Sequence, residues 1–227
     1  MTDFTMQKGD DGVAVITWDV SGKSMNVLSF DGAGELDRLM DDALADDAVK
    51  GIVITSGKAD FAAGMDLNVI AAMKDGGAQA VFDLVMQLHA VLRKIERAGM
   101  DPKTLKGGKP IAAALPGTAL GIGLELPLST HRIFAADNPK AKIGLPEIMV
   151  GIFPGAGGTT RLVRKLGAMQ AAPLLLEGKP VRLAGQDSTR GTFSQRHSAL
   201  IDQKTENRYY PLNHIAEGQA HYEVIDS

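Results

Sequence analysis

The sequence of 227 residues contains no cysteine, few aromatic residues and no long apolar run. The absence of cysteine excludes disulfides, thiol nucleophiles and thiolate metal sites, and is compatible with a reducing compartment. No apolar run approaches the roughly 20 residues that a membrane-spanning helix requires. The 24 basic residues are balanced by 27 acidic ones, and no cluster of lysine and arginine indicates a nucleic-acid surface. We therefore expect neither a membrane nor a nucleic acid as a partner.

The first residues, Met1–Phe4, lack the basic and apolar regions of a signal peptide. This start and the absence of cysteine predict a cytoplasmic location. Three of the five histidines lie near the end of the chain, but their spacing matches no zinc-ligand pattern. We therefore expect no metal site at His197, His214 and His221.

The sequence predicts that strands and helices alternate along roughly the first 115 residues. Val13–Trp18 is rich in β-branched residues, and Gly51–Thr55 and Pro110–Leu115 are apolar runs suited to a buried parallel sheet. Ser29 is expected to cap the first of two amphipathic helices. The apolar stripes of these helices recur at close to 3.6 residues: Leu36, Leu39, Met40, Ala43 and Leu44, then Val81, Leu84, Val85, Leu88, Val91, Leu92 and Ile95. The alternation predicts an α/β fold.

Glycine-bearing loops follow these strands at Phe61–Leu67, Gly117–Glu125 and Gly144–Ile148 with Gly151–Thr159. A tight loop at the end of a strand can direct backbone N–H groups into a crevice, although a plain turn is the alternative for the first loop. N–H groups at the helix start after the second loop could stabilise a thioester oxygen that becomes an enolate. A dinucleotide fingerprint is excluded because Leu126 stands where its third glycine should be, and no P-loop motif is present.

Two glutamates, Glu125 and Glu147, stand between apolar neighbours beside these loops. Loss of water around Glu147 would raise its pKa and favour a proton-donor role. A lone glutamate is more often a surface turn residue, and a perturbed carboxylate can be structural. The residues alone therefore leave a catalytic pair and two structural carboxylates open.

Three segments resemble the signature blocks of the crotonase superfamily and follow one another in the same order: Gly117–Glu125, Gly144–Ile148 and Pro154–Arg161. More narrowly, Thr118–Leu126 with Lys142–Leu162 resembles the hydratase part of multifunctional fatty-acid β-oxidation enzymes. The resemblance covers about residues 10–178 and implies an α/β crotonase-like spiral of ββα units. It implies hydration of an acyl-CoA thioester, trans-2-enoyl-CoA, to 3-hydroxyacyl-CoA. No cofactor is implied, since coenzyme A is part of the substrate.

The same resemblance assigns roles to individual residues. It places the catalytic glutamates at Glu125 and Glu147, and the two backbone N–H groups of an oxyanion hole at Met65 and Ile122. Glu125 would help to deprotonate the attacking water, and Glu147 would deliver a proton to the α-carbon. Further residues of these loops are expected to line the substrate site: Ala63, Gly64, Asp66, Gly121, Pro146 and Gly155. We assign Asp66 to loop geometry rather than to chemistry.

The chain departs from the family pattern in two places. Ile122 stands where glycine is commonest, and its N–H can serve as a donor only if its φ is negative; we expect its side chain to pack beside the acyl chain. The loop Gly99–Gly108 is longer than in minimal hydratases and carries Lys103 and Lys106. These lysines could reach the CoA phosphates, but a solvated loop is favoured.

The last part of the chain differs in composition from the rest. All ten methionines lie at or before Met169, whereas all three tyrosines lie at or after Tyr209. Residues 180–227, and Gly185–His197 above all, resemble an internal piece of the E1 component of 2-oxoglutarate dehydrogenase. That family binds thiamine diphosphate, and its cofactor motif is absent here. We therefore predict a crotonase-like domain over 1–178 and a foreign, loosely packed tail over 179–227, with a divergent tail as the alternative.

This tail stands where the family has helices that close the acyl pocket and build a homotrimer. We expect the C-terminal helical region to be missing or replaced, and a homotrimer is therefore doubtful. Two other functions stay open. One is isomerisation of an enoyl-CoA by a single glutamate, although the presence of both glutamates favours a hydratase. The other is binding of acyl-CoA without catalysis.

Overall fold

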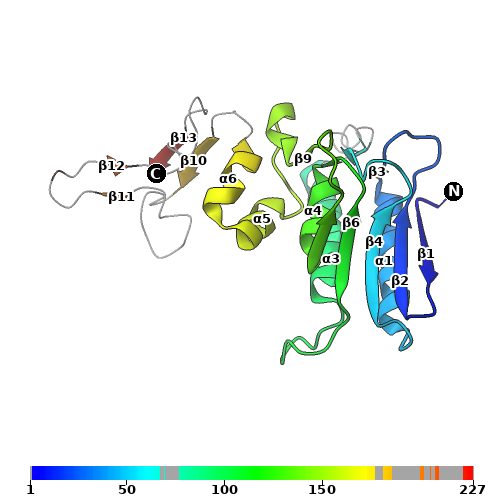
Figure 1. The fold of residues 1–227 in the computed structure, drawn as a ribbon. Coiled ribbons are helices and arrows are strands. Elements are labelled where there is room, and N and C mark those ends of the chain that lie inside the picture. The colour runs from blue at the N-terminus through cyan, green and yellow to red at the C-terminus, as the bar shows by residue number, and fades with distance from the viewer. Residues whose placement is uncertain are drawn as a thin grey trace. The chain divides into compact units, whose positions relative to one another are not determined.

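The computed structural model describes residues 2–66, 69, 77–176, 181–185, 200–201, 205, 208–209 and 222–226 (Figure 1). The chain divides into two compact units. The larger consists of Met1–Leu145 with Phe153–Arg161, and the smaller of Pro146–Ile152 with Leu162–Ser227.

The larger unit repeats one pattern, in which a strand of the main sheet is followed by a short strand and a helix. The elements are β1 (Phe4–Lys8), β2 (Val13–Trp18), β3 (Val27–Leu28), α1 (Phe30–Ala45), β4 (Gly51–Ser56), β5 (Gly64–Met65), α3 (Gly77–Arg97), β6 (Ile111–Leu115), β7 (Ala119–Leu120), α4 (Ile122–Ser129), β8 (Arg132–Ala135) and β9 (Ile143–Gly144). The order β2-β3-α1, β4-β5-α3, β6-β7-α4 confirms the predicted spiral of ββα units.

The main sheet has five strands in the order β1-β2-β4-β6-β8. Strand β1 is antiparallel to β2, and the other neighbours are parallel. The short strands pair separately, β3 with β5 and β7 with β9. Each short strand follows a strand of the main sheet, so the short strands and their loops gather beyond its carboxyl edge, where ligands bind in parallel sheets.

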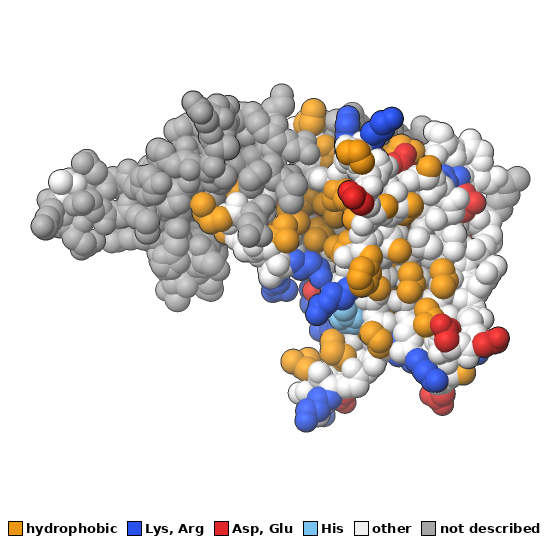
Figure 2. Space-filling model, in the orientation of Figure 1, with side chains coloured by type: hydrophobic (Ala, Val, Ile, Leu, Met, Phe, Trp, Pro, Cys, Tyr) orange, Lys and Arg blue, Asp and Glu red, His pale blue; other side chains and the backbone are white. Residues whose placement is uncertain are grey.

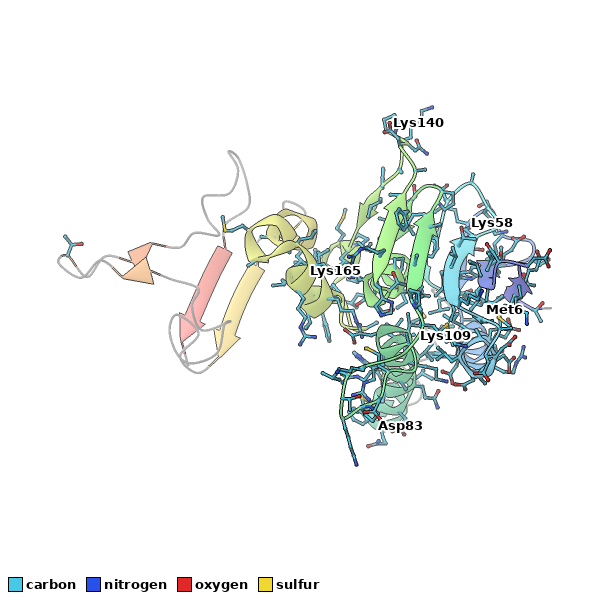
Figure 3. The ribbon with its side chains drawn as sticks, turned by 60° about the horizontal axis from the view of Figure 1, so that its bottom comes forward. Met6, Lys58, Asp83, Lys109, Lys140 and Lys165 are labelled. Carbon is cyan, nitrogen blue, oxygen red and sulfur yellow. The ribbon has the colours of Figure 1, made fainter. Side chains whose placement is uncertain are left out.

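One face of the main sheet packs on α1 and α3, which lie on the same side of it (Figures 1 and 3). Alternate residues of β2 and β4 are fully buried there, as expected for a strand with one face toward a core. On the other face Val15, Val53 and Ala112 are half-buried, and Figure 2 shows apolar side chains across the larger unit.

The predicted cap and apolar stripe of α1 are confirmed. Ser29 Oγ accepts a hydrogen bond from Gly32 N–H, and the stripe residues Leu36, Leu39, Met40 and Ala43 are buried. In α3 the second half of the predicted stripe is more deeply buried than the first. Leu88, Val91, Leu92 and Ile95 are buried, whereas Val81, Leu84 and Val85 are half-buried. Phe82 and Met86, which lie off the predicted stripe, are at least half exposed.

Asn26 ties the ends of two main strands to the first glycine-bearing loop. Its side chain is fully buried. The carboxamide oxygen accepts from Val20 N–H at 2.9 Å. The amide nitrogen donates to the carbonyls of Trp18 and Phe61 and to Ser56 Oγ, at 2.9 to 3.0 Å. Asn26 O also accepts from Ala63 N–H, so this residue fixes where the loop leaves β4.

The smaller unit contains the 3₁₀ helix η1 (Pro146–Val150), part of α5 (Gly158–Leu166) and α6 (Ala168–Leu176). Its strands are β10 (Val181–Gly185), β11 (Leu200–Ile201), β12 (Arg208–Tyr209) and β13 (Tyr222–Asp226), with β10 parallel to β13 and β11 antiparallel to β12. The predicted boundary at 178 and nearly all of the motif 185–197 lie outside the described residues. None of the helices in the described ranges is long and apolar enough to cross a membrane.

We predict that Asn26→Ala lowers the free energy of unfolding by about 3 kcal/mol, because it removes the hydrogen-bond partners of the buried groups Val20 N–H and Phe61 O and one of the partners of Trp18 O. Urea unfolding followed by the fluorescence of Trp18, the single tryptophan, measures this in the larger unit. Asn138→Ala is the matched control, since that asparagine is exposed, and its effect should stay below about 1 kcal/mol. Equal losses in the two variants would contradict the role of Asn26.

Candidate active site

The loop after β4 and the turn before α4 are in direct contact. Leu120 N–H donates to Ala62 O at 3.0 Å, and Ala62 forms an isolated parallel bridge with Ala119. A Cβ atom on Gly123 would lie 2.8 Å from Ala62 Cβ and 2.9 Å from Ala62 O. The residue at 123 must therefore be glycine for the two segments to approach this closely. The structure thus brings together the segments that carry Met65 and Ile122.

The N–H of Met65 points away from strand β3. At this end of the β3–β5 pair the hydrogen bond to Leu28 O is donated by Asp66 N–H at 2.9 Å. Successive N–H groups of an extended strand point to opposite edges, so the N–H of Met65 points to the other edge. A Cβ atom on Gly64 would lie 3.5 Å from Leu120 O, which places β5 beside the start of α4.

The turn into α4 leaves the N–H of Ile122 available. Gly121 has φ 56°, a conformation that favours glycine. Its N–H donates to Gly144 O, and its carbonyl accepts from the N–H groups of Leu124 and Glu125. The N–H of Ile122 has no acceptor among the described residues, as expected at a helix start. Its φ is not positive, so the condition for a donor at this position is met, and its side chain is buried in the core.

Glu125 lies in the first turn of α4 and is 3% exposed. Its Oε1 accepts hydrogen bonds from Ala156 N–H at 2.9 Å and from Gly158 N–H at 2.8 Å. A buried carboxylate is costly unless such donors surround it. A Cβ atom on Gly158 would lie 2.7 Å from Glu125 Cγ, so the absence of a side chain there makes room for the carboxylate.

Side chains from α3 and α5 hold the loop that contains Gly155. His89 Nε2 lies 2.8 Å from Gly155 O. Arg161, which is 7% exposed, donates from Nη1 to Ala156 O at 2.7 Å and from Nη2 to Glu96 at 3.3 Å. The sequence did not single out His89 or Glu96. One sequence feature could have indicated His89: it is a polar residue directly after Leu88, which belongs to the buried stripe of α3.

Pro146 and Glu147 belong to the smaller unit and open the helix η1. Glu147 is 8% exposed, so it is a buried residue and not a surface turn residue. Its carbonyl accepts from Ile152 N–H at 3.1 Å, and Ile148 O accepts from Gly151 N–H at 3.2 Å. The pairing of Glu147 with Glu125 stays a prediction.

Asp66 anchors the first glycine-bearing loop. Its carboxylate pairs with Lys23 Nζ at 2.6 Å, its N–H donates to Leu28 O and its carbonyl accepts from Val69 N–H. These bonds hold the backbone directly after Met65, which supports the assignment of Asp66 to loop geometry.

The lysine-bearing loop 99–108 lies at the end of the sheet opposite to the glycine-bearing loops. It leads into the start of β6, whereas Gly117 and Gly121 follow the end of β6. Figure 3 shows Lys109 and Lys58 at opposite ends of the sheet. Hydrogen bonds from the backbone and side chain of Thr104 and the backbone of Lys103 lower the pKa of Asp101 and brace the loop. This position supports a solvated loop rather than contact with CoA phosphates.

The chain belongs to the enoyl-CoA hydratase/isomerase family, whose sequence profile matches residues 8–191. The fatty acid oxidation complex subunit alpha of Idiomarina loihiensis is 42% identical over 182 residues, which cover 79% of this chain and 24% of that protein. The corresponding subunit of Shewanella frigidimarina is 37% identical over 180 residues, with the same coverage. The chain therefore spans about a quarter of the length of these relatives.

A crystal structure of an enoyl-CoA hydratase from Bacillus anthracis aligns with a TM-score of 0.66 and 27% identity. The alignment covers 77% of this chain and 62% of that chain. Together with the family match, it confirms the predicted crotonase fold class.

We predict that Gly123→Ala lowers the free energy of unfolding by about 1–3 kcal/mol, because the new methyl group overlaps Ala62. Gly34→Ala in α1 is the matched control, since a Cβ atom there meets nothing within 4 Å. That change should raise the free energy of unfolding by up to about 1 kcal/mol. Both are measured by urea unfolding with Trp18 fluorescence. Wild-type stability in Gly123→Ala would contradict the close approach of the two segments.

Proposed function

We propose that this chain hydrates trans-2-enoyl-CoA to 3-hydroxyacyl-CoA, as a step of fatty-acid β-oxidation. The observation that carries the proposal is the buried carboxylate of Glu125, held by two N–H groups beside the start of α4. The membership of the family and the names of the relatives supply the substrate class.

Glu125 is the proposed base. Water loses a proton to this carboxylate while its oxygen bonds to the β-carbon of the enoyl group. The two N–H bonds to Oε1 fix the plane of the carboxylate, as required of a group that must orient a water molecule. As the C–O bond forms, the π electrons of the double bond move into the bond between the α-carbon and the thioester carbon, and the π electrons of the thioester carbonyl move onto its oxygen.

The backbone N–H groups of Met65 and Ile122 are the proposed oxyanion hole. They come from two segments that touch through Ala62 and Gly123. The positive end of α4 adds to the stabilisation of the enolate oxygen, because Ile122 is its first residue. The substrate's thioester lies, in this proposal, against Ala63, Gly64, Gly121, Pro146 and Gly155.

Glu147 is the proposed acid. It gives a proton to the α-carbon as the enolate collapses to the thioester, so that the product has gained one water molecule. Burial of Glu147 fits a group that exchanges its proton with substrate rather than with bulk solvent. After the product has left, water that enters the site takes the proton from Glu125 and supplies one to Glu147, so that both groups return to their starting states.

The wider setting of the reaction is also part of the proposal. Coenzyme A enters as part of the substrate, and no metal or redox cofactor takes part. A cytoplasmic location, a role beside further activities like those of the longer relatives, and a foreign tail over 179–227 are predictions that follow from the sequence. The family's homotrimer stays doubtful for this chain because of that tail.

We predict that Glu125→Gln and Glu147→Gln each lower kcat for a short trans-2-enoyl-CoA by about 100-fold or more, because each removes a proton-transfer group. Loss of the absorbance of the conjugated thioester measures turnover. Glu35→Gln is the matched control. Glu35 also accepts two backbone N–H bonds, from Asp3 and Phe4, but it lies on α1. The turnover of the Glu35→Gln variant should therefore stay near that of the wild type.

Other outcomes separate the rival functions. Conversion of a 3-enoyl-CoA to a 2-enoyl-CoA, with a loss in only one of the two glutamine variants, would favour an isomerase. Calorimetric binding of an acyl-CoA by a chain that unfolds cooperatively but shows no turnover would favour a binding protein. Hydration at the wild-type rate in both glutamine variants would contradict the assignment of Glu125 and Glu147 as the catalytic pair.

A further inference from the structure

Each N–H that holds Glu125 belongs to a peptide group in the loop 155–158. The N–H of Ala156 donates to Glu125 Oε1, and the carbonyl of the same peptide group, Gly155 O, lies 2.8 Å from His89 Nε2. A peptide group is planar, so a rotation that moves its oxygen also moves its N–H. His89 and Glu125 thus bind the two ends of one rigid plane.

The tautomer of His89 follows from this contact. A carbonyl oxygen only accepts hydrogen bonds, so Nε2 of His89 must carry the proton. The chain of bonds then runs from His89 N–H to Gly155 O, and from Ala156 N–H to Glu125. Hydrogen bonds in such a chain polarise one another and strengthen each other.

The neighbouring peptide groups of the loop are braced in the same way. Arg161 donates to Ala156 O at 2.7 Å and pairs with Glu96 of α3. Gly157 O accepts from Arg161 N–H at 3.0 Å. Gly157 has φ 89°, so the loop contains a residue of high intrinsic freedom, and its geometry depends on these side-chain bonds.

We propose that His89 is a positioning residue for Glu125, acting through the Gly155–Ala156 peptide group. The inference rests on the proposed function only for the expected change in kcat. The hydrogen bonds that link His89, the Gly155–Ala156 peptide group and Glu125 can be tested without turnover. Without the His89 donor the peptide plane is free to rotate. Its N–H then no longer fixes the carboxylate in the orientation that activates water, while the proposed oxyanion donors at Met65 and Ile122, which bind the thioester oxygen, stay in place.

The test compares three variants on α3 of the full chain. His89→Leu has a similar volume and no donor. His89→Gln keeps an N–H donor at a comparable distance from the backbone. Gln87→Leu places the same leucine on an exposed position of the same helix and serves as the control.

Two readouts are used. Amide hydrogen exchange of Ala156, measured by NMR and corrected for global stability from urea unfolding, should be about 10-fold faster in His89→Leu and near wild type in the other two variants. For the hydration of a short trans-2-enoyl-CoA, His89→Leu should lower kcat about 10-fold or more with KM within about 2-fold, and His89→Gln should restore most of kcat.

The outcomes separate this inference from the proposed function. Unchanged protection of Ala156 in His89→Leu would overturn the role of His89, whatever the activity. Faster exchange with unchanged kcat in an active enzyme would overturn it as well, and would leave the hydratase standing. Faster exchange in a folded chain whose wild type has no turnover would support the positioning of Glu125 by His89 and contradict the proposed reaction.

Discussion

The account depends on one buried interaction, the carboxylate of Glu125 held by the N–H groups of Ala156 and Gly158. A charged group with so little exposure needs both donors to be stable. Their presence fixes several other features. Position 158 has to lack a side chain, since a Cβ atom would lie 2.7 Å from Glu125 Cγ. The loop has to be braced from α3 and α5, and α4 has to begin at the tight turn of Gly121.

The repeat of the fold explains why these parts meet. Each strand of the main sheet is followed by a short strand beyond its carboxyl edge, so loops that are far apart in sequence gather there. Asn26 links the ends of β2 and β4 to the loop of Met65, and Gly123 allows that loop to touch the start of α4. The backbone, more than any side chain, therefore forms the proposed oxyanion hole.

Local features were predictable from the sequence, and features that depend on distant contacts were not. The cap at Ser29, the stripe of α1 and the turn before Glu125 follow from short-range patterns that the structure confirms. The first half of α3 has the same apolar period as its second half, yet Val81, Leu84 and Val85 are only half-buried, because the apolar period does not reveal where the surface that covers a helix ends. The role of His89 was hidden because its partner is a backbone carbonyl 66 residues away, and backbone groups leave no mark in the residue pattern.

The central claim is that the chain adds water across the double bond of an enoyl thioester. The most direct measurement is mass spectrometry of the product after a short trans-2-enoyl-CoA is incubated with the purified 227-residue chain in water labelled with heavy oxygen and deuterium. The account predicts saturable formation of 3-hydroxyacyl-CoA with labelled oxygen on the β-carbon and one deuterium on the α-carbon. Recovery of unlabelled substrate from a cooperatively folded chain that binds it, or deuterium uptake without oxygen, would contradict the account.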